Sequence, residues 1–107
     1  MSAQYRILFQ VRRPYYDAIV AGTKTFELRG HTLRWYNMAW RALMALEDGM
    51  FATAVFTSGR RVHRRRIVGV KWVENAEVAL GRPPTTEELE FLGAGEVVRF
   101  ALGEVVP

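Results

Sequence analysis

Residues 12–29 read RRPYYDAIVAGTKTFELR and contain a boundary between a helix and a strand. Pro14 suits the first turn of a helix, because its φ angle is fixed at a helical value and its missing N–H is not needed there. Gly22 suits the left-handed position at which many helices end. These two residues predict a helix over residues 14–21.

The residues after this glycine alternate between apolar and polar side chains with period two, which is typical of a strand. Phe26 and Leu28 point to one face, and Glu27 and Arg29 point to the other. We predict that the apolar pair lies in the core and the charged pair on a solvated face. Lys24 stands at the junction of helix and strand, where we expect its side chain to share one cavity with Glu27.

The string Gly22-x-Lys24-x-x-Glu27-x-Arg29 follows an aromatic-rich helix and a strand. In this arrangement it resembles the signature of the ASCH domain, a small β-barrel related to the PUA domains of RNA-modifying proteins. The resemblance implies one α+β domain over residues 1–107, built as a PUA-like mixed barrel of about five strands capped by short helices. An open α+β sandwich is the alternative.

The resemblance also implies a ligand site on the polar face of the strand. The predicted ligand-binding residues are Lys24, Glu27, Arg29 and Tyr16. Tyr16 can project beside Arg12 and Arg13, where an exposed ring can stack on a base, and packing in the core or at its rim is the alternative. The same charged residues are also typical of an ordinary solvated face, on which each screened ion pair contributes about 0 to 1 kcal/mol.

An enzymatic function is the alternative to binding. Some ASCH-like proteins are similar to amidohydrolases that deacylate an acylated cytidine with a lysine, a threonine and a later glutamate, and others are described as ribonucleases. The motif lysine corresponds to Lys24, but Glu27 occupies the position of the threonine. Glu74 and Glu77 are candidates for the later glutamate by location alone. In an enzyme, Lys24 and Glu27 would be the catalytic residues.

The charge distribution favours a polyanionic partner, because the formal net charge is +4 and the pI is near 10.0. Arginines cluster between residues 60 and 66, whereas acidic residues concentrate after residue 73. We predict that the partner is RNA or another nucleic acid, with a nucleotide-like small molecule as the alternative. The predicted nucleic-acid-binding residues are Arg12, Arg13, Arg60, Arg61, Arg64, Arg65 and Arg66.

Residues 51–57 and 60–73 alternate on either side of a Ser-Gly pair, which predicts a β-hairpin. Arg64 and Arg66 share the parity of the apolar residues further along the second strand. A β-bulge, or a hairpin end that is wet on both faces, would keep these arginines out of the core. We predict an exposed basic tip over residues 57–66. The alternative is that these arginines bind no partner and only keep an edge strand from pairing with another chain.

Other patterns complete the expected fold. The remaining predicted elements are a strand at 5–11, a helix at 33–46, a helix at 85–92 begun by a capping box of Thr85 and Glu88, and a strand at 97–102. We expect Trp35 and Trp40, on the helix at 33–46, to pack in the core. The first and last strands are expected to be neighbours.

Several classes of function are disfavoured by composition. The chain has no cysteine, and neither His31 nor His63 has an acidic residue at metal-ligand spacing, so we expect no metal and no cofactor. The sequence shows no phosphate-cradling loop and no dinucleotide fingerprint. The first residues lack the apolar core of a signal peptide, and the apolar runs are short, so we expect a cytoplasmic protein with no membrane partner.

Overall fold

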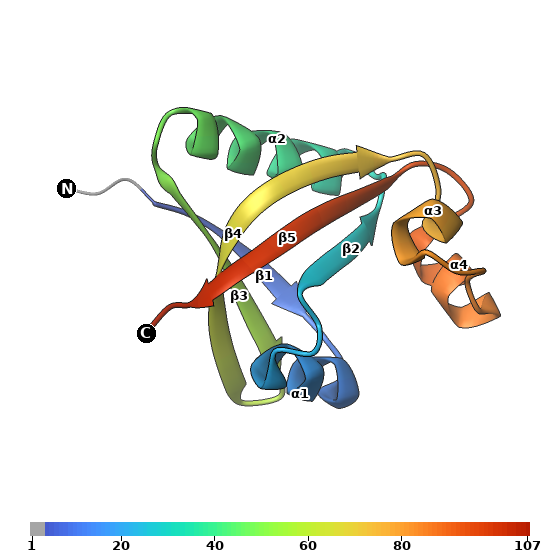
Figure 1. The fold of residues 1–107 in the computed structure, drawn as a ribbon, viewed down its shortest axis with the longest axis horizontal. Helices are drawn as coiled ribbons and strands as arrows, with labels where there is room; N and C mark the ends of the chain where they lie inside the picture. The colour runs from blue at the N-terminus through green and yellow to red at the C-terminus, as the bar shows by residue number, and fades with distance from the viewer. Residues whose placement is uncertain (1–3) are drawn as a thin grey trace.

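The computed structural model describes residues 4–107, which form five strands and four helices (Figure 1). The strands are β1 (Gln4–Gln10), β2 (Phe26–Gly30), β3 (Phe51–Ser58), β4 (Arg61–Val73) and β5 (Val97–Val105). The helices are α1 (Arg13–Ala21), α2 (Leu33–Glu47), α3 (Ala76–Leu80) and α4 (Thr86–Leu92). The predicted α+β class is confirmed, with the strands in one mixed sheet.

The sheet has the strand order β1-β3-β4-β5-β2 and curls into a half-barrel (Figure 1). β1 and β3 are parallel, and the other neighbours are antiparallel. The expectation that the first and last strands are neighbours is wrong, because β5 lies between β4 and β2. The cause is the connection through α1, β2 and α2, which returns the chain to run parallel beside β1.

The predicted helix boundaries are confirmed where a local signal was strong. Gly22 has φ +80° and donates its N–H to the carbonyls of Ala18 and Ile19, which ends α1. Thr85 and Glu88 form both hydrogen bonds of the capping box before α4. The helix α3 was not predicted.

A β-bulge, one of the two arrangements that the sequence left open for the second hairpin strand, is present in β4. The pairing of β4 with β5 shifts register between Arg65 and Ile67, and again between Ile67 and Gly69. Ile67 is in the core, and beyond the bulge the inward residues are Val70 and Trp72. The shift therefore lets one strand keep arginines outside near the tip and apolar side chains inside further along.

The main core lies between the sheet and α2, which crosses one face of the sheet (Figure 1). Ala39 and Ala42 of α2 are fully buried there, and Trp35 stacks on the ring of Phe9. Trp40 does not lie in the core as expected, because it points to the rim and is 45% exposed. None of the helices in residues 4–107 has the length and hydropathy of a membrane span.

Candidate functional site

A cavity of about 750 Å³ opens between β2, the first turn of α1 and the helix α4. Its volume falls in the range of roughly 300 to 1,000 Å³ that is usual for small-molecule sites. The wall contributed by β2 extends from Lys24 to Arg29, and the opposite wall comes from Glu87 to Leu92. The stretch with the ASCH-like signature therefore lines a cavity large enough for a small molecule.

Local hydrogen bonds fix the entry of the chain into this wall. The amides of Thr23 and Lys24 both donate to the carbonyl of Ala18, at 3.0 and 3.1 Å, and so turn the chain away from α1. The amide of Leu102 then donates to the carbonyl of Thr25 at 2.9 Å, which docks the chain on β5. Lys24 is held at the junction of helix and strand, with its side chain partly buried.

Three charged side chains form a row on the β2 wall, which we call the Lys24–Glu27–Arg29 row. The Nζ atom of Lys24 lies 3.0 Å from Oε1 of Glu27, and the backbone amide of Leu28 donates to the same oxygen at 3.1 Å. Arg29 Nη2 lies 3.5 Å from the other oxygen, Oε2. The structure thus brings these three predicted site residues together.

The expectation that Glu27 and Arg29 lie on a solvated face is wrong. Glu27 is 4% exposed and Arg29 is 8% exposed, because both faces of β2 are covered. A side chain at Gly30 would place Cβ 2.7 Å from the carbonyl oxygen of Leu92, so the end of α4 lies directly on this strand. The covering element is far away in the sequence, and the alternation within β2 carries no sign of it.

Aromatic rings surround the Arg29 guanidinium. Its Cζ lies 5.2 Å from the centre of the Phe9 ring, 5.0 Å from Trp35 and 5.1 Å from Phe91. Burial lowers the pKa of Arg29, and the charge of Glu27 opposes this change. Arg29 also donates through Nη2 to the carbonyl of Gln10 at 3.4 Å, which ties β2 to the end of β1.

Two polar atoms of the row are buried without a hydrogen-bond partner among residues 4–107. They are Oε2 of Glu27 and Nε of Arg29. Buried polar groups in folded proteins are nearly always hydrogen-bonded, so an acceptor and a donor in this state are unusual. The row therefore contains an unsatisfied acceptor and an unsatisfied donor, both of them buried beside the cavity.

Tyr16 packs in the core, as the alternative had it, and is not exposed for stacking on a base. Its side chain is 8% exposed, and its ring meets His63 of β4 edge-on at 6.4 Å, because this face of α1 packs on the hairpin. The neighbouring Tyr15 lines the cavity instead, with Lys24 Nζ 5.0 Å from its ring centre. Sequence reasoning missed Tyr15 because the helix rotates about 100° per residue, and the pattern did not show which tyrosine faces the core.

Four of the seven arginines predicted to bind nucleic acid are already engaged. Arg12 pairs with Glu87, and Arg13 donates to Asp17 at 2.9 Å. Arg65 donates to two backbone carbonyls, of Gly103 at 2.6 Å and of Ile19 at 3.0 Å. Arg66 lies 3.9 Å from the centre of the Phe51 ring and 3.8 Å from a carboxylate oxygen of Glu104.

The other three arginines form what we call the tip arginines. They are Arg60, Arg61 and Arg64. All three are exposed, Arg60 in the β3–β4 turn and Arg61 and Arg64 on β4, and in the described part of the chain none has an ion pair or a side-chain hydrogen bond. The hairpin tip predicted at residues 57–66 is confirmed as a structure, and its unpaired positive charge resides in these three residues.

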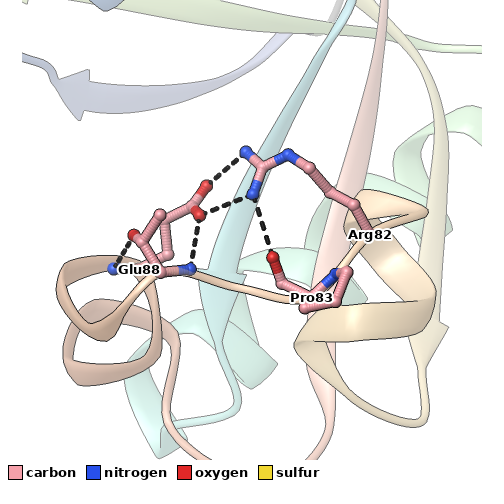
Figure 2. Close-up of polar contacts among 4 residues, drawn as sticks. Arg82, Pro83 and Glu88 are labelled. Atoms are coloured by element: carbon pink, nitrogen blue, oxygen red, sulfur yellow. Dashed lines mark hydrogen bonds and ion pairs between the residues drawn. The ribbon is translucent and has the colours of Figure 1, made fainter.

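The outer wall of the cavity contains charged residues that sequence reasoning did not assign to the site. Figure 2 shows Arg82 extended toward Glu88 of α4, with the two side chains joined by two hydrogen bonds of 2.8 Å. Arg82 also donates to the carbonyl of Pro83 at 3.2 Å. The Arg82 hydrogen bonds, with a further one from the backbone of Thr85, lower the pKa of Glu88 to about 2. The capping box was a signal for this wall, but it gave no hint of a cavity.

Other candidate groups lie elsewhere. Glu74 and Glu77, the possible later glutamates of an amidohydrolase, are exposed and do not line the cavity. Within residues 4–107, no three His, Cys, Asp or Glu side chains converge as metal ligands would. The ionisable groups that the cavity offers are therefore the Lys24–Glu27–Arg29 row and the charged residues of the opposite wall.

No protein-family model matches the sequence, and no curated protein matches it. The fold, however, is similar to the crystal structure of the S128A mutant of ZmASCH from Zymomonas mobilis. The TM-score is 0.62 at 14% sequence identity, and the match covers 97% of this chain and 71% of that chain. An identity this low establishes likeness of fold. The chain therefore has the fold of an ASCH-domain protein, as the motif in residues 22–29 implied.

Proposed function

We propose that the chain is a nucleic-acid-binding module with RNA as its partner. In this proposal the cavity takes up one unstacked base, and the tip arginines contact backbone phosphates. The observation that carries the proposal is the Lys24–Glu27–Arg29 row on the cavity wall, with its unsatisfied acceptor and donor. The similarity of fold to ZmASCH supports the assignment to this group of small binding folds.

The chemistry of the row matches the edge of a base. A carboxylate oxygen accepts from ring or exocyclic N–H groups, and the lysine and arginine donate to carbonyl or ring nitrogen acceptors. Tyr15 lies next to the lysine end of the row and Phe91 next to the arginine end. Aromatic rings of this kind stack on single-stranded bases, with about 1 to 3 kcal/mol for each base.

We expect one short strand to reach both the cavity and the tip arginines. The helix α1, of nine residues, contributes Tyr15 to the cavity lining. The hairpin packs directly on this helix through His63 and Tyr16, and through the bond from Arg65 to Ile19. A few nucleotides can therefore connect a base in the cavity with phosphates at the tip.

Replacing Arg60, Arg61 and Arg64 with glutamine is expected to weaken RNA binding in a salt-dependent way. Each neutralised phosphate of a single strand adds about 0.7 to the slope of log affinity against log salt, so the slope should fall by about two units. Fluorescence anisotropy with a labelled single-stranded RNA measures the slope.

The matched control for this experiment removes the same charge elsewhere. Arg6, Arg41 and Lys71 are exposed on β1, α2 and β4, and their joint replacement with glutamine should leave the slope nearly unchanged. An equal loss of slope in both triple variants would mean that net charge alone drives binding, and the tip would then lose its assigned role.

Hydrolysis of RNA or of an acylated cytidine is a second candidate. The observation that favours it is a partly buried amine, that of Lys24, only 3.0 Å from the buried carboxylate of Glu27. An acid–base or nucleophilic step could use such a pair.

Lys24→Arg separates binding from hydrolysis, because arginine keeps the positive charge but cannot act as a base or nucleophile. If the protein is a binding module, we expect Lys24→Arg to lose part of its RNA affinity, and we expect no turnover in the wild type or in this variant. The assay follows RNA cleavage and deacylation of an acylated cytidine, with Glu27→Gln as a parallel variant. If the wild type shows turnover and both variants lack it, the protein is a hydrolase and the proposal of a binding module is wrong.

A further inference from the structure

The charges around the cavity are balanced, in contrast to the chain as a whole, which has a formal charge of +4. The cationic side chains that line it are Arg12, Lys24, Arg29 and Arg82. The acidic side chains that line it are Glu27, Glu87, Glu88 and Glu90. Their formal charges cancel, so the excess positive charge of the protein lies outside the cavity.

Each of these cations already faces a carboxylate of the same chain. Lys24 and Arg29 share Glu27, at 3.0 and 3.5 Å, and Arg82 binds Glu88 through two bonds of 2.8 Å (Figure 2). The remaining cation, Arg12, pairs with Glu87 across the cavity between α1 and α4. A phosphate that entered the cavity would compete with these internal partners and would meet the additional negative charge of Glu90.

The rest of the lining is apolar and partly aromatic. It includes Val11, Tyr15, Phe26, Leu28, Leu80 and Phe91. Flat, uncharged heterocycles bury their faces against such walls, and their polar edges need only a few donors and acceptors. The lining can therefore bind a flat ring through packing and a few hydrogen bonds, but it attracts an anion only weakly.

We infer that the cavity selects an uncharged nucleobase or nucleoside over its phosphorylated form, and that Glu87 is the residue that enforces this selection. The inference rests on the proposed function and names the ligand class of the same cavity. Phosphates of a bound strand lie outside, on the tip arginines, which have no internal carboxylate partner within residues 4–107.

Glu87 is distinguishable from the other acidic residues of the wall. Glu88 caps α4 and binds Arg82, so its removal would disturb the helix itself. Glu87 is exposed, and its interaction in the described structure is the pair with Arg12. Its replacement therefore frees one cation at the cavity without removing a structural bond of α4.

The test compares the four ribonucleosides with their 5′-monophosphates by isothermal titration calorimetry, in wild type and in Glu87→Gln. In the wild type we expect the best nucleoside to bind at least as tightly as its monophosphate. In Glu87→Gln the monophosphate should gain about fivefold over the nucleoside, because one repulsive charge is removed and Arg12 becomes available. Glu47→Gln, the same substitution on an exposed part of α2, is the control and should change neither affinity.

The outcomes separate this inference from the proposed function. A wild-type monophosphate that binds ten times more tightly than its nucleoside would overturn the inference, as would RNA binding that requires Lys24 while no nucleoside binds. If Glu87→Gln prefers the nucleoside over its monophosphate to the same degree as the wild type, Glu87 does not enforce the selection. If neither nucleosides nor nucleotides bind and the affinity for RNA is the same in Lys24→Arg, the proposed function itself fails.

Discussion

Arg29→Ala is expected to lower the free energy of unfolding by about 3 to 5 kcal/mol, the usual cost of breaking a buried charge pair by removing one partner. The guanidinium of Arg29 fills the space between Phe9, Trp35 and Phe91. Its loss would leave a hole there and would leave Glu27 buried with Lys24 as its remaining cation. Urea denaturation followed by tryptophan fluorescence measures the difference.

The control for this change replaces the pair with neutral groups of similar volume. The double variant Glu27→Gln, Arg29→Met should recover much of the lost stability, since neutral replacements of a buried pair are often nearly as stable as the pair. A loss below about 1 kcal/mol in Arg29→Ala would instead match a screened surface ion pair, and the described burial of the row would then be wrong.

Phe9→Ala is expected to have an effect of similar size, about 3 to 5 kcal/mol, through loss of packing. The ring of Phe9 is 0% exposed, stacks on Trp35 at 5.3 Å and on Phe56 at 5.2 Å, and meets Phe100 edge-on at 5.2 Å. Truncation opens a cavity in the centre of the core, which the surrounding rings cannot fill without moving.

The matched control is Phe51→Ala, which makes the same substitution at a different position, on β3. Phe51 is about half exposed, and its main partner is the Arg66 guanidinium, a contact worth about 0.5 to 1 kcal/mol at an exposed site. Phe51→Ala should therefore cost far less than Phe9→Ala under the same denaturant. Equal losses would show that the aromatic cluster around Phe9 does not dominate the stability of the domain.

Local signals in the sequence were sufficient to predict most helix ends and the hairpin. Gly22 ends α1 through its positive φ, and Thr85 begins α4, because these effects depend on residues within one turn. The helix α3 had a similar signal, since the side chain of Asn75 accepts from the amide of Val78, and it was overlooked because the segment is only five residues long.

Long-range packing explains what the sequence pattern did not reveal. Lys24, Glu27 and Arg29 were correctly grouped, since three or five positions along one segment keep side chains close. Their burial depends on α4, which follows β2 by more than fifty positions, and no local alternation reports such a contact. Likewise, Arg12 pairs with Glu87, which is far away in the sequence, and such a contact could not be inferred from the spacing of residues.

Within residues 4–107, the strand that contains the candidate site has one sheet partner. This strand, β2, pairs there only with β5, where Phe26 lies opposite Ala101 and Gly30 opposite Val97. Contacts between such distant positions close large loops and form slowly in folding. During synthesis β5 leaves the ribosome after β1 to β4, so the hairpin β3–β4 can form before β2 has a partner. The candidate site can therefore form only after β5 has paired with β2, which places its assembly late in folding.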